Sequence, residues 1–251
     1  MLEHDLSELP YRSLRPFCRL IAASSEGAQL LELDGVVATV VPVTPERSIT
    51  NSVVYEHPEA LKQALEPLAA AYADAGIRAW TVWVPERDGG AQELLDRAGH
   101  RLDAAPTAMA LDLDAFEPAP TADLELDRTP AASAIGCIND AAYGFDGEFA
   151  RAFATVPEEV NVYAALLDGE AVACLGTIHD QGDCGIYLVG TLPKARGRGL
   201  ATKLMTVALE EGRAAGCETA SLQSTAMGKP IYTRLGFRDL GTIQMWERRV
   251  T

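Results

Sequence analysis

The chain has 251 residues, 48% of them hydrophobic and 23% charged, and a formal net charge of −15. This composition is typical of a globular protein, and no apolar run is long enough to cross a bilayer. The negative charge disfavours binding to nucleic acid or to an anionic membrane, and it favours a neutral or cationic partner.

At this length we expect two domains rather than one. The start, Met1–Asp5, is acidic and lacks the basic region of a signal peptide, so we expect a cytoplasmic protein. The five cysteines are odd in number and include no Cys-x-x-Cys pair, which argues against a disulfide framework and a zinc site. We therefore expect reduced core cysteines and no metal.

In the first half, the apolar pattern predicts a partly helical opening over residues 6–23 and a β-hairpin around Asp34-Gly35. A strand over Ser48–Tyr55, a helix ending near Ala75-Gly76 and a strand over Ala79–Val84 follow.

A linker is predicted over residues 116–123, which contain two prolines. Beyond it, the pattern predicts two helices, over Thr129–Ala142 and Asp146–Ala154, and a hairpin around Asp168-Gly169. The last strand of this series, Ile186–Val189, leads into a glycine-rich stretch.

The stretch 189–202 joins this strand to a helix and contains Gly197 and Gly199. Glycine adopts positive φ without steric cost, so successive N–H groups at the helix N-terminus can converge on one anion. The guanidinium groups of Arg196 and Arg198 match phosphate oxygens in geometry. The stretch therefore predicts a loop that binds a pyrophosphate.

The spacing disfavours two other phosphate loops. A nucleotide P-loop ends in Gly-Lys-Ser/Thr, whereas Leu200 and Ala201 follow Gly199 here. A dinucleotide-binding fingerprint needs a third glycine, which this stretch lacks.

The run Arg-x-x-Gly-x-Ala, Arg196–Ala201, resembles the acyl-CoA loop of the GNAT superfamily of N-acetyltransferases. Downstream, Tyr-x-x-x-Gly-Phe, Tyr232–Phe237, is similar to the second signature of that family, and the intervening elements come in the family's order. The resemblance covers about residues 124–251. It implies a mixed α/β fold, with a mostly antiparallel mixed sheet flanked by helices, and an enzyme that transfers an acyl group from acetyl-CoA to a primary amine of a small molecule.

The resemblance also implies roles for particular residues. Tyr232 matches the position of the family's general acid, and a phenol with a pKa near 10 can protonate a departing thiolate. Five residues are candidates for a general base by position, and a water molecule relayed from backbone carbonyls would also serve; the sequence does not choose among them: Asp140, Glu148, His179, Asp180 and Asp183. The implied coenzyme-binding residues are Val189, Gly190, Thr191, Arg196, Gly197, Arg198, Gly199, Leu200, Ala201 and Thr202.

The first half repeats the order of the second. Tyr55 corresponds to Val189 at an offset of 134, whereas Gly76 corresponds to Gly216 at an offset of 140. The jump of about six positions falls on the phosphate loop, so the first copy lacks that loop. Leu95 also stands where the second copy has Tyr232.

We therefore expect two tandem GNAT-like domains. Residues 1–115 would form a degenerate domain without an acyl-CoA loop, residues 116–123 the linker, and residues 124–251 the catalytic domain. The acidic exterior favours a cationic acceptor. Two other functions stay open, a non-catalytic acyl-CoA-binding or sensing protein and a purely structural tandem, as do the monomeric and homodimeric states.

Overall fold

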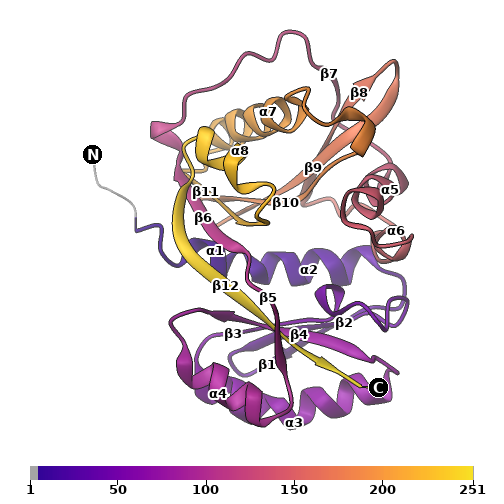
Figure 1. Cartoon of the computed structure of the whole chain (residues 1–251), viewed down its shortest axis with the longest axis vertical. Coiled ribbons are helices and arrows are strands. Elements are labelled where there is room, and N and C mark those ends of the chain that lie inside the picture. Colours follow the sequence, from indigo (N-terminus) through magenta and orange to yellow (C-terminus); the bar gives the residue numbers. More distant parts are fainter. Residues whose placement is uncertain (1–4, 251) are drawn as a thin grey trace.

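The computed structural model describes residues 5–250 (Figure 1). Residues 1–4, which belong to the start of the chain on which the expected cytoplasmic location rests, lie outside this range. The helices are α1 Leu9–Arg12, α2 Leu14–Ser24, α3 Pro58–Asp74, α4 Gly89–Arg97, α5 Ala132–Tyr143, α6 Glu148–Ala152, α7 Leu200–Ala214 and α8 Lys229–Arg234. The strands are β1 Gln29–Leu33, β2 Val36–Val40, β3 Ser52–Tyr55, β4 Ala79–Pro85, β5 Arg101–Ala104, β6 Thr107–Asp112, β7 Glu125–Asp127, β8 Val160–Leu167, β9 Glu170–Asp180, β10 Asp183–Thr191, β11 Thr219–Ser224 and β12 Arg238–Arg249.

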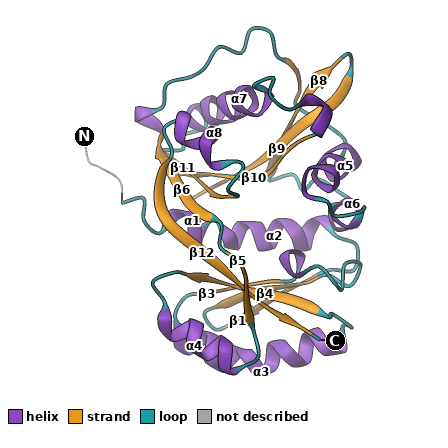
Figure 2. Ribbon diagram, viewed as in Figure 1, coloured by secondary structure: helices purple, strands orange, loops and turns teal. Residues whose placement is uncertain are grey.

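The described strands form one mixed sheet in the order β1-β2-β3-β4-β12-β6-β11-β10-β9-β8-β7, with β5 paired to β12. Most neighbours are antiparallel, and only β3–β4 and β10–β11 run parallel. Helices flank the sheet in both halves (Figure 2). The expected fold class, a mostly antiparallel mixed sheet flanked by helices, is confirmed.

The two halves exchange their last strands. β6, from the first half, pairs with β11 and with the beginning of β12. The end of β12, Ile243–Arg249, pairs in turn with β4 of the first half. The linker at residues 116–123 thus separates the halves along the sequence, but each half contains a strand from the other.

Helix α2 lies between the two halves in Figure 1. Its buried side chains pack toward both halves. Leu14 and Cys18 pack with Trp83 of β4 and Met245 of β12. Phe17 packs on the other side, among residues of α5, α6 and β10. A helix that is apolar on two sides is stable only between two packed layers, so α2 joins the halves into one core.

The two copies differ at the connection between strand and helix. In the first copy, only Glu56 and His57 lie between β3 and α3. In the second, residues 192–199 lie between β10 and α7. The expected deficit of about six residues in the first copy is therefore confirmed. His57 caps α3, because its Nδ1 accepts the N–H of Ala60 at 3.1 Å.

Among the described residues, no helix combines the length and apolar character needed to cross a membrane. Within the same range all five cysteines are free, and Cys18, Cys174, Cys184 and Cys217 are buried. Cys137 is exposed, so the expectation that every cysteine belongs to the core is wrong for this residue.

His100 takes the place in the first copy that Phe237 takes in the second. It is completely buried, it packs edge-on against Trp80 with 4.5 Å between ring centroids, and neither ring nitrogen has a partner among the described residues. Burial lowers the pKa of His100 to about 4. The unfolded chain therefore takes up a proton at this imidazole before the folded chain does.

We expect this histidine to make stability depend on pH. Above pH 6.5, the pKa of histidine in the unfolded chain, this imidazole does not lower the free energy of unfolding. As the pH falls from there to 4, its titration lowers the free energy of unfolding by about 3 kcal/mol. His100→Phe removes the titrating group and restores an aromatic ring, so this variant should lose about 3 kcal/mol less than the wild type between pH 7.5 and pH 4. Urea unfolding at several pH values measures the difference. Leu102→Ala, a change at an exposed residue that does not titrate, is the control and should keep the wild-type pH dependence.

Candidate active site

The predicted loop ends in the bare N-terminus of a helix. Gly197 and Gly199 have φ of +77° and +72°, and Gly199 is the N-cap of α7. No side chain caps this helix, and the N–H groups of its first turn have no acceptor within the helix. The first copy fills the corresponding position with His57. In the second copy, the helix dipole and its free N–H groups are left for an anion.

Arg196 and Arg198 lie in the loop at this helix end and, like Arg234 of α8, have no carboxylate partner among the described residues. Arg196 donates to the carbonyl oxygens of Thr191 and Ala142, at 3.3 Å each. Most other arginines of this acidic protein form ion pairs, for example Arg128 with Glu211 at 2.8 Å. Unpaired positive charge at a helix N-terminus favours an anionic ligand there.

Strand β10 separates from β11 next to the loop. Their pairing covers only Asp183–Gly185 against Thr219–Ser221, and beyond it the two strands have no ladder bonds. β10 also contains a bulge between Tyr187 and Gly190, where Leu188 has a φ of +58°. The backbone after the bulge therefore has hydrogen-bonding groups that no strand satisfies, as the GNAT resemblance implies for the pantetheine arm.

Side chains from α5 and β9 hold the bulge. The carbonyl oxygen of Leu188 accepts hydrogen bonds from Asn139 Nδ2 and Cys174 Sγ, at 3.3 Å each. The hydroxyl of Tyr143 donates to the carbonyl oxygen of Val189 at 2.7 Å. The sequence analysis missed all three residues, because the spacing within a predicted helix or strand does not reveal which carbonyl its side chains reach.

The opening between the strands is a cavity of about 890 Å³, which we call the main cavity. All the predicted coenzyme-binding residues line it, from Val189–Thr191 through Arg196–Thr202, and so does Tyr232. The structure thus brings to one place residues from a strand, a loop and two helices. Part of the wall comes from the first half, including Trp83 and Ile49, which the sequence analysis did not predict.

Tyr232 lies on α8, largely buried, with its ring edge-on to Phe237 at 5.9 Å between centroids. Burial raises the pKa of Tyr232 above its ordinary value of 10, and the nearby Tyr143 raises it further. No residue in the described range forms a hydrogen bond with its hydroxyl. The phenol is therefore protonated at neutral pH and free to donate a hydrogen bond into the cavity.

None of the five candidate bases lines the main cavity. The Asp140 carboxylate accepts the N–H groups of Phe149 and Ala150 at 2.8 and 3.0 Å, so it fixes the start of α6. Glu148 pairs with Arg47. Both carboxylates therefore stabilise the fold around the cavity without facing it.

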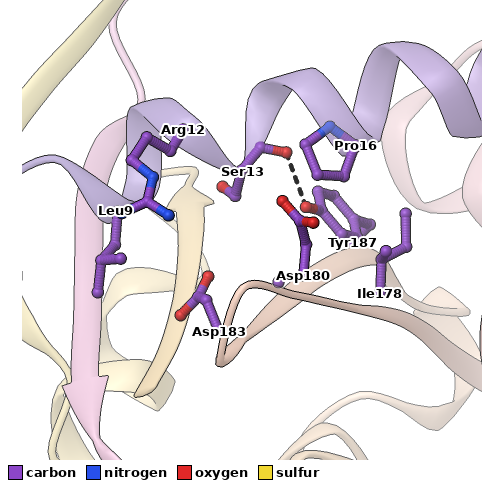
Figure 3. A pocket seen from close by; sticks show the side chains of 9 residues that line it. Leu9, Arg12, Ser13, Pro16, Ile178, Asp180, Asp183 and Tyr187 are labelled. Atoms are coloured by element: carbon purple, nitrogen blue, oxygen red, sulfur yellow. Dashed lines mark hydrogen bonds between the residues drawn. The ribbon is translucent and has the colours of Figure 1, made fainter. Parts of the chain in front are cut away.

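The other candidates lie near the far end of β9 and β10. Asp180 and Asp183 line a separate cavity of about 10 Å³ below α1 and α2 (Figure 3). Asp183 accepts hydrogen bonds from the hydroxyls of Thr219 and Ser221, at 2.7 and 2.5 Å. His179 is half-buried, and its buried Nε2 lies near Gly212 of α7. A cavity of this size holds no more than a water molecule.

Residues 125–237 match the model of the acetyltransferase (GNAT) family. These residues form a GNAT domain. Solved structures extend the likeness in fold to the whole chain. A GCN5-related N-acetyltransferase from Kribbella flavida has a TM-score of 0.69 at 20% identity, with 97% of this chain and 96% of that chain covered.

A GNAT-family structure from Novosphingobium aromaticivorans has a TM-score of 0.61 at 18% identity and covers 99% of this chain and 100% of its own. A tandem GNAT protein from the clavulanic acid biosynthesis pathway has a TM-score of 0.60 at 15% identity, with 90% and 84% covered. No protein of curated function matches the sequence significantly. The GNAT family transfers acyl groups and generally uses acetyl-CoA, so acyl transfer is the general activity of this fold.

Proposed function

We propose that this chain is an acetyl-CoA-dependent N-acetyltransferase that acylates a primary amine of a small molecule. One observation carries the proposal: the bare N-terminus of α7, with unpaired Arg196 and Arg198, opens onto the same cavity as the buried phenol of Tyr232. The helix end would bind the pyrophosphate and Tyr232 would act as the acid, both in one cavity. This arrangement suits acetyl-CoA, whose pyrophosphate and thioester lie at different ends of the molecule.

In this proposal the N–H groups of residues 196–202 hold the pyrophosphate, and the backbone at Val189–Thr191 bonds the pantetheine arm as an added strand would. A pantetheine amide at the Val189 carbonyl oxygen would replace the Tyr143 hydroxyl that binds there now. A free N–H group beside the bulge would stabilise the oxyanion that forms on the thioester.

The amine nitrogen attacks the thioester carbonyl carbon, the C–N bond forms, and the C–S bond breaks. Tyr232 gives its proton to the thiolate, whose own pKa rises in the same apolar surroundings. The proton lost by the attacking nitrogen restores the phenol through solvent. The first copy has neither an open helix end nor this phenol, and we propose that it is not catalytic.

The test is to titrate the protein with acetyl-CoA by calorimetry and then to follow free thiol with a panel of amines. Coenzyme binding with amine-dependent thiol release supports the transferase. Binding without release from any amine favours the alternative, a non-catalytic acyl-CoA-binding or sensing protein. No binding, or binding in the first copy in a soaked crystal, rejects the assignment.

A further inference from the structure

The main cavity has an apolar wall built from both halves of the chain. The first half supplies Leu14 and Phe17 of α2, Ile49 and Trp83, and the second half supplies Phe145 and Met245. Trp83 and Met245 are directly paired residues of β4 and β12. The strand exchange therefore builds this wall, which neither half contains alone.

The polar groups of Trp83, and of Tyr187 and Gln223, which also line the main cavity, donate hydrogen bonds within the protein. Trp83 Nε1 donates to Ser52 Oγ at 2.9 Å, and the Tyr187 hydroxyl donates to the Ser13 carbonyl oxygen at 2.7 Å. The Gln223 amide donates to Ser13 Oγ at 3.0 Å. With these donors satisfied within the protein, aromatic and aliphatic surface is what remains for a ligand.

The described lining of the main cavity contains no aspartate, glutamate or histidine. Its charged residues are Arg196, Arg198 and Arg234, and all three are positive. An ammonium group would enter this cavity without a carboxylate partner, and losing water would add to the cost. Aromatic faces attract cations, but an ammonium has no lone pair with which to attack a thioester.

We propose that the acceptor is an aromatic amine that is uncharged at neutral pH, such as an arylamine, rather than an alkylamine or a polyamine. This proposal rests on the proposed transferase function. An alkylamine has a pKa of roughly 10, like lysine, and must lose a proton before it reacts. An arylamine is already neutral, so a cavity without a base can use it. It also fills the aromatic wall with a flat apolar body.

The reaction balances without any further reactant. The arylamine lone pair forms the new C–N bond, the C–S bond breaks, and the nitrogen loses one proton while the coenzyme sulfur gains one. The products are an N-acetylarylamine and free coenzyme A. This outcome replaces the cationic acceptor that the acidic exterior favours, because the cavity wall, not the exterior, contacts the substrate.

The experiment compares arylamines of one to three rings with their aminomethyl counterparts, which have the same body and a basic nitrogen, and with spermidine. We expect kcat/KM for the best arylamine to exceed that of its counterpart by at least tenfold at pH 7. Between pH 6 and pH 8 the arylamine value should stay nearly constant. The counterpart's value should rise about tenfold per unit, as its neutral fraction does.

Two wall variants, Phe145→Leu and Trp83→Leu, should lower kcat/KM for the arylamine about tenfold and leave acetyl-CoA affinity unchanged. Trp246→Leu is the matched control, because Trp246 packs against the core of the first half and does not line the cavity. An aminomethyl compound or spermidine that outperforms every arylamine overturns this inference but leaves the transferase intact. If acetyl-CoA binds and no amine releases thiol, both proposals fail.

Discussion

Replacing Tyr232 by phenylalanine is expected to lower kcat by about 100-fold or more, which is the contribution of a positioned general acid. The ring and its edge-on contact with Phe237 remain, so the fold and the affinity for acetyl-CoA should stay within about twofold of the wild type. Because burial raises its pKa above 10, Tyr232 stays protonated from pH 6 to pH 9. Titration of Tyr232 should therefore cause no change in kcat between pH 6 and pH 9.

Two other tyrosines serve as matched controls for this variant. Tyr163 is also buried, but its hydroxyl donates to Glu211 at 2.8 Å outside the main cavity, so Tyr163→Phe should leave kcat unchanged. Tyr143→Phe removes the hydroxyl that binds the Val189 carbonyl and should have a smaller effect than Tyr232→Phe. A large loss of kcat in Tyr143→Phe together with a normal rate in Tyr232→Phe would assign the acid to Tyr143.

The double variant Arg196→Ala with Arg198→Ala should raise the Kd for acetyl-CoA about 100-fold. Each guanidinium would contribute a charge-assisted hydrogen bond to phosphate, worth about 1.5–3 kcal/mol, and part of this remains with the N–H groups of α7. Calorimetric titration at low and high salt measures the change, and the salt dependence of wild-type binding should weaken in the variant.

Arg97 and Arg101 provide the control pair, because they are exposed arginines of the first copy, far along the chain from the loop and absent from the cavity wall. Replacing both by alanine makes the same change in net charge. A Kd that shifts equally in the two double variants would mean that only overall charge matters. A Kd within about threefold of the wild type in the loop variant would place the pyrophosphate elsewhere.

Local patterns in the sequence predicted most elements of the fold. The strand over Ala79–Val84 and the hairpin around Asp34-Gly35 both exist, because alternating apolar residues and an Asp-Gly turn act over a few residues. The predicted strand over Ser48–Tyr55 is only half strand, since Ser48–Thr50 forms a 3₁₀ turn. The side chain of Asn51 holds this turn in place, because it accepts the N–H of Val41 and donates to the carbonyl oxygen of Thr44.

What the sequence determined by itself was the glycine-rich loop before α7, its absence from the first copy, and the place of Tyr232 on a helix after β11. Each depends on residue types at short, fixed spacing, and glycine or proline imposes that geometry locally. Only the tertiary structure decided that β6 and β12 change places and that Trp83 and Met245 therefore meet in the wall of the main cavity. Strand order is set by which partners complete the sheet and bury the core, and contacts between residues so far apart leave no periodic trace in the chain.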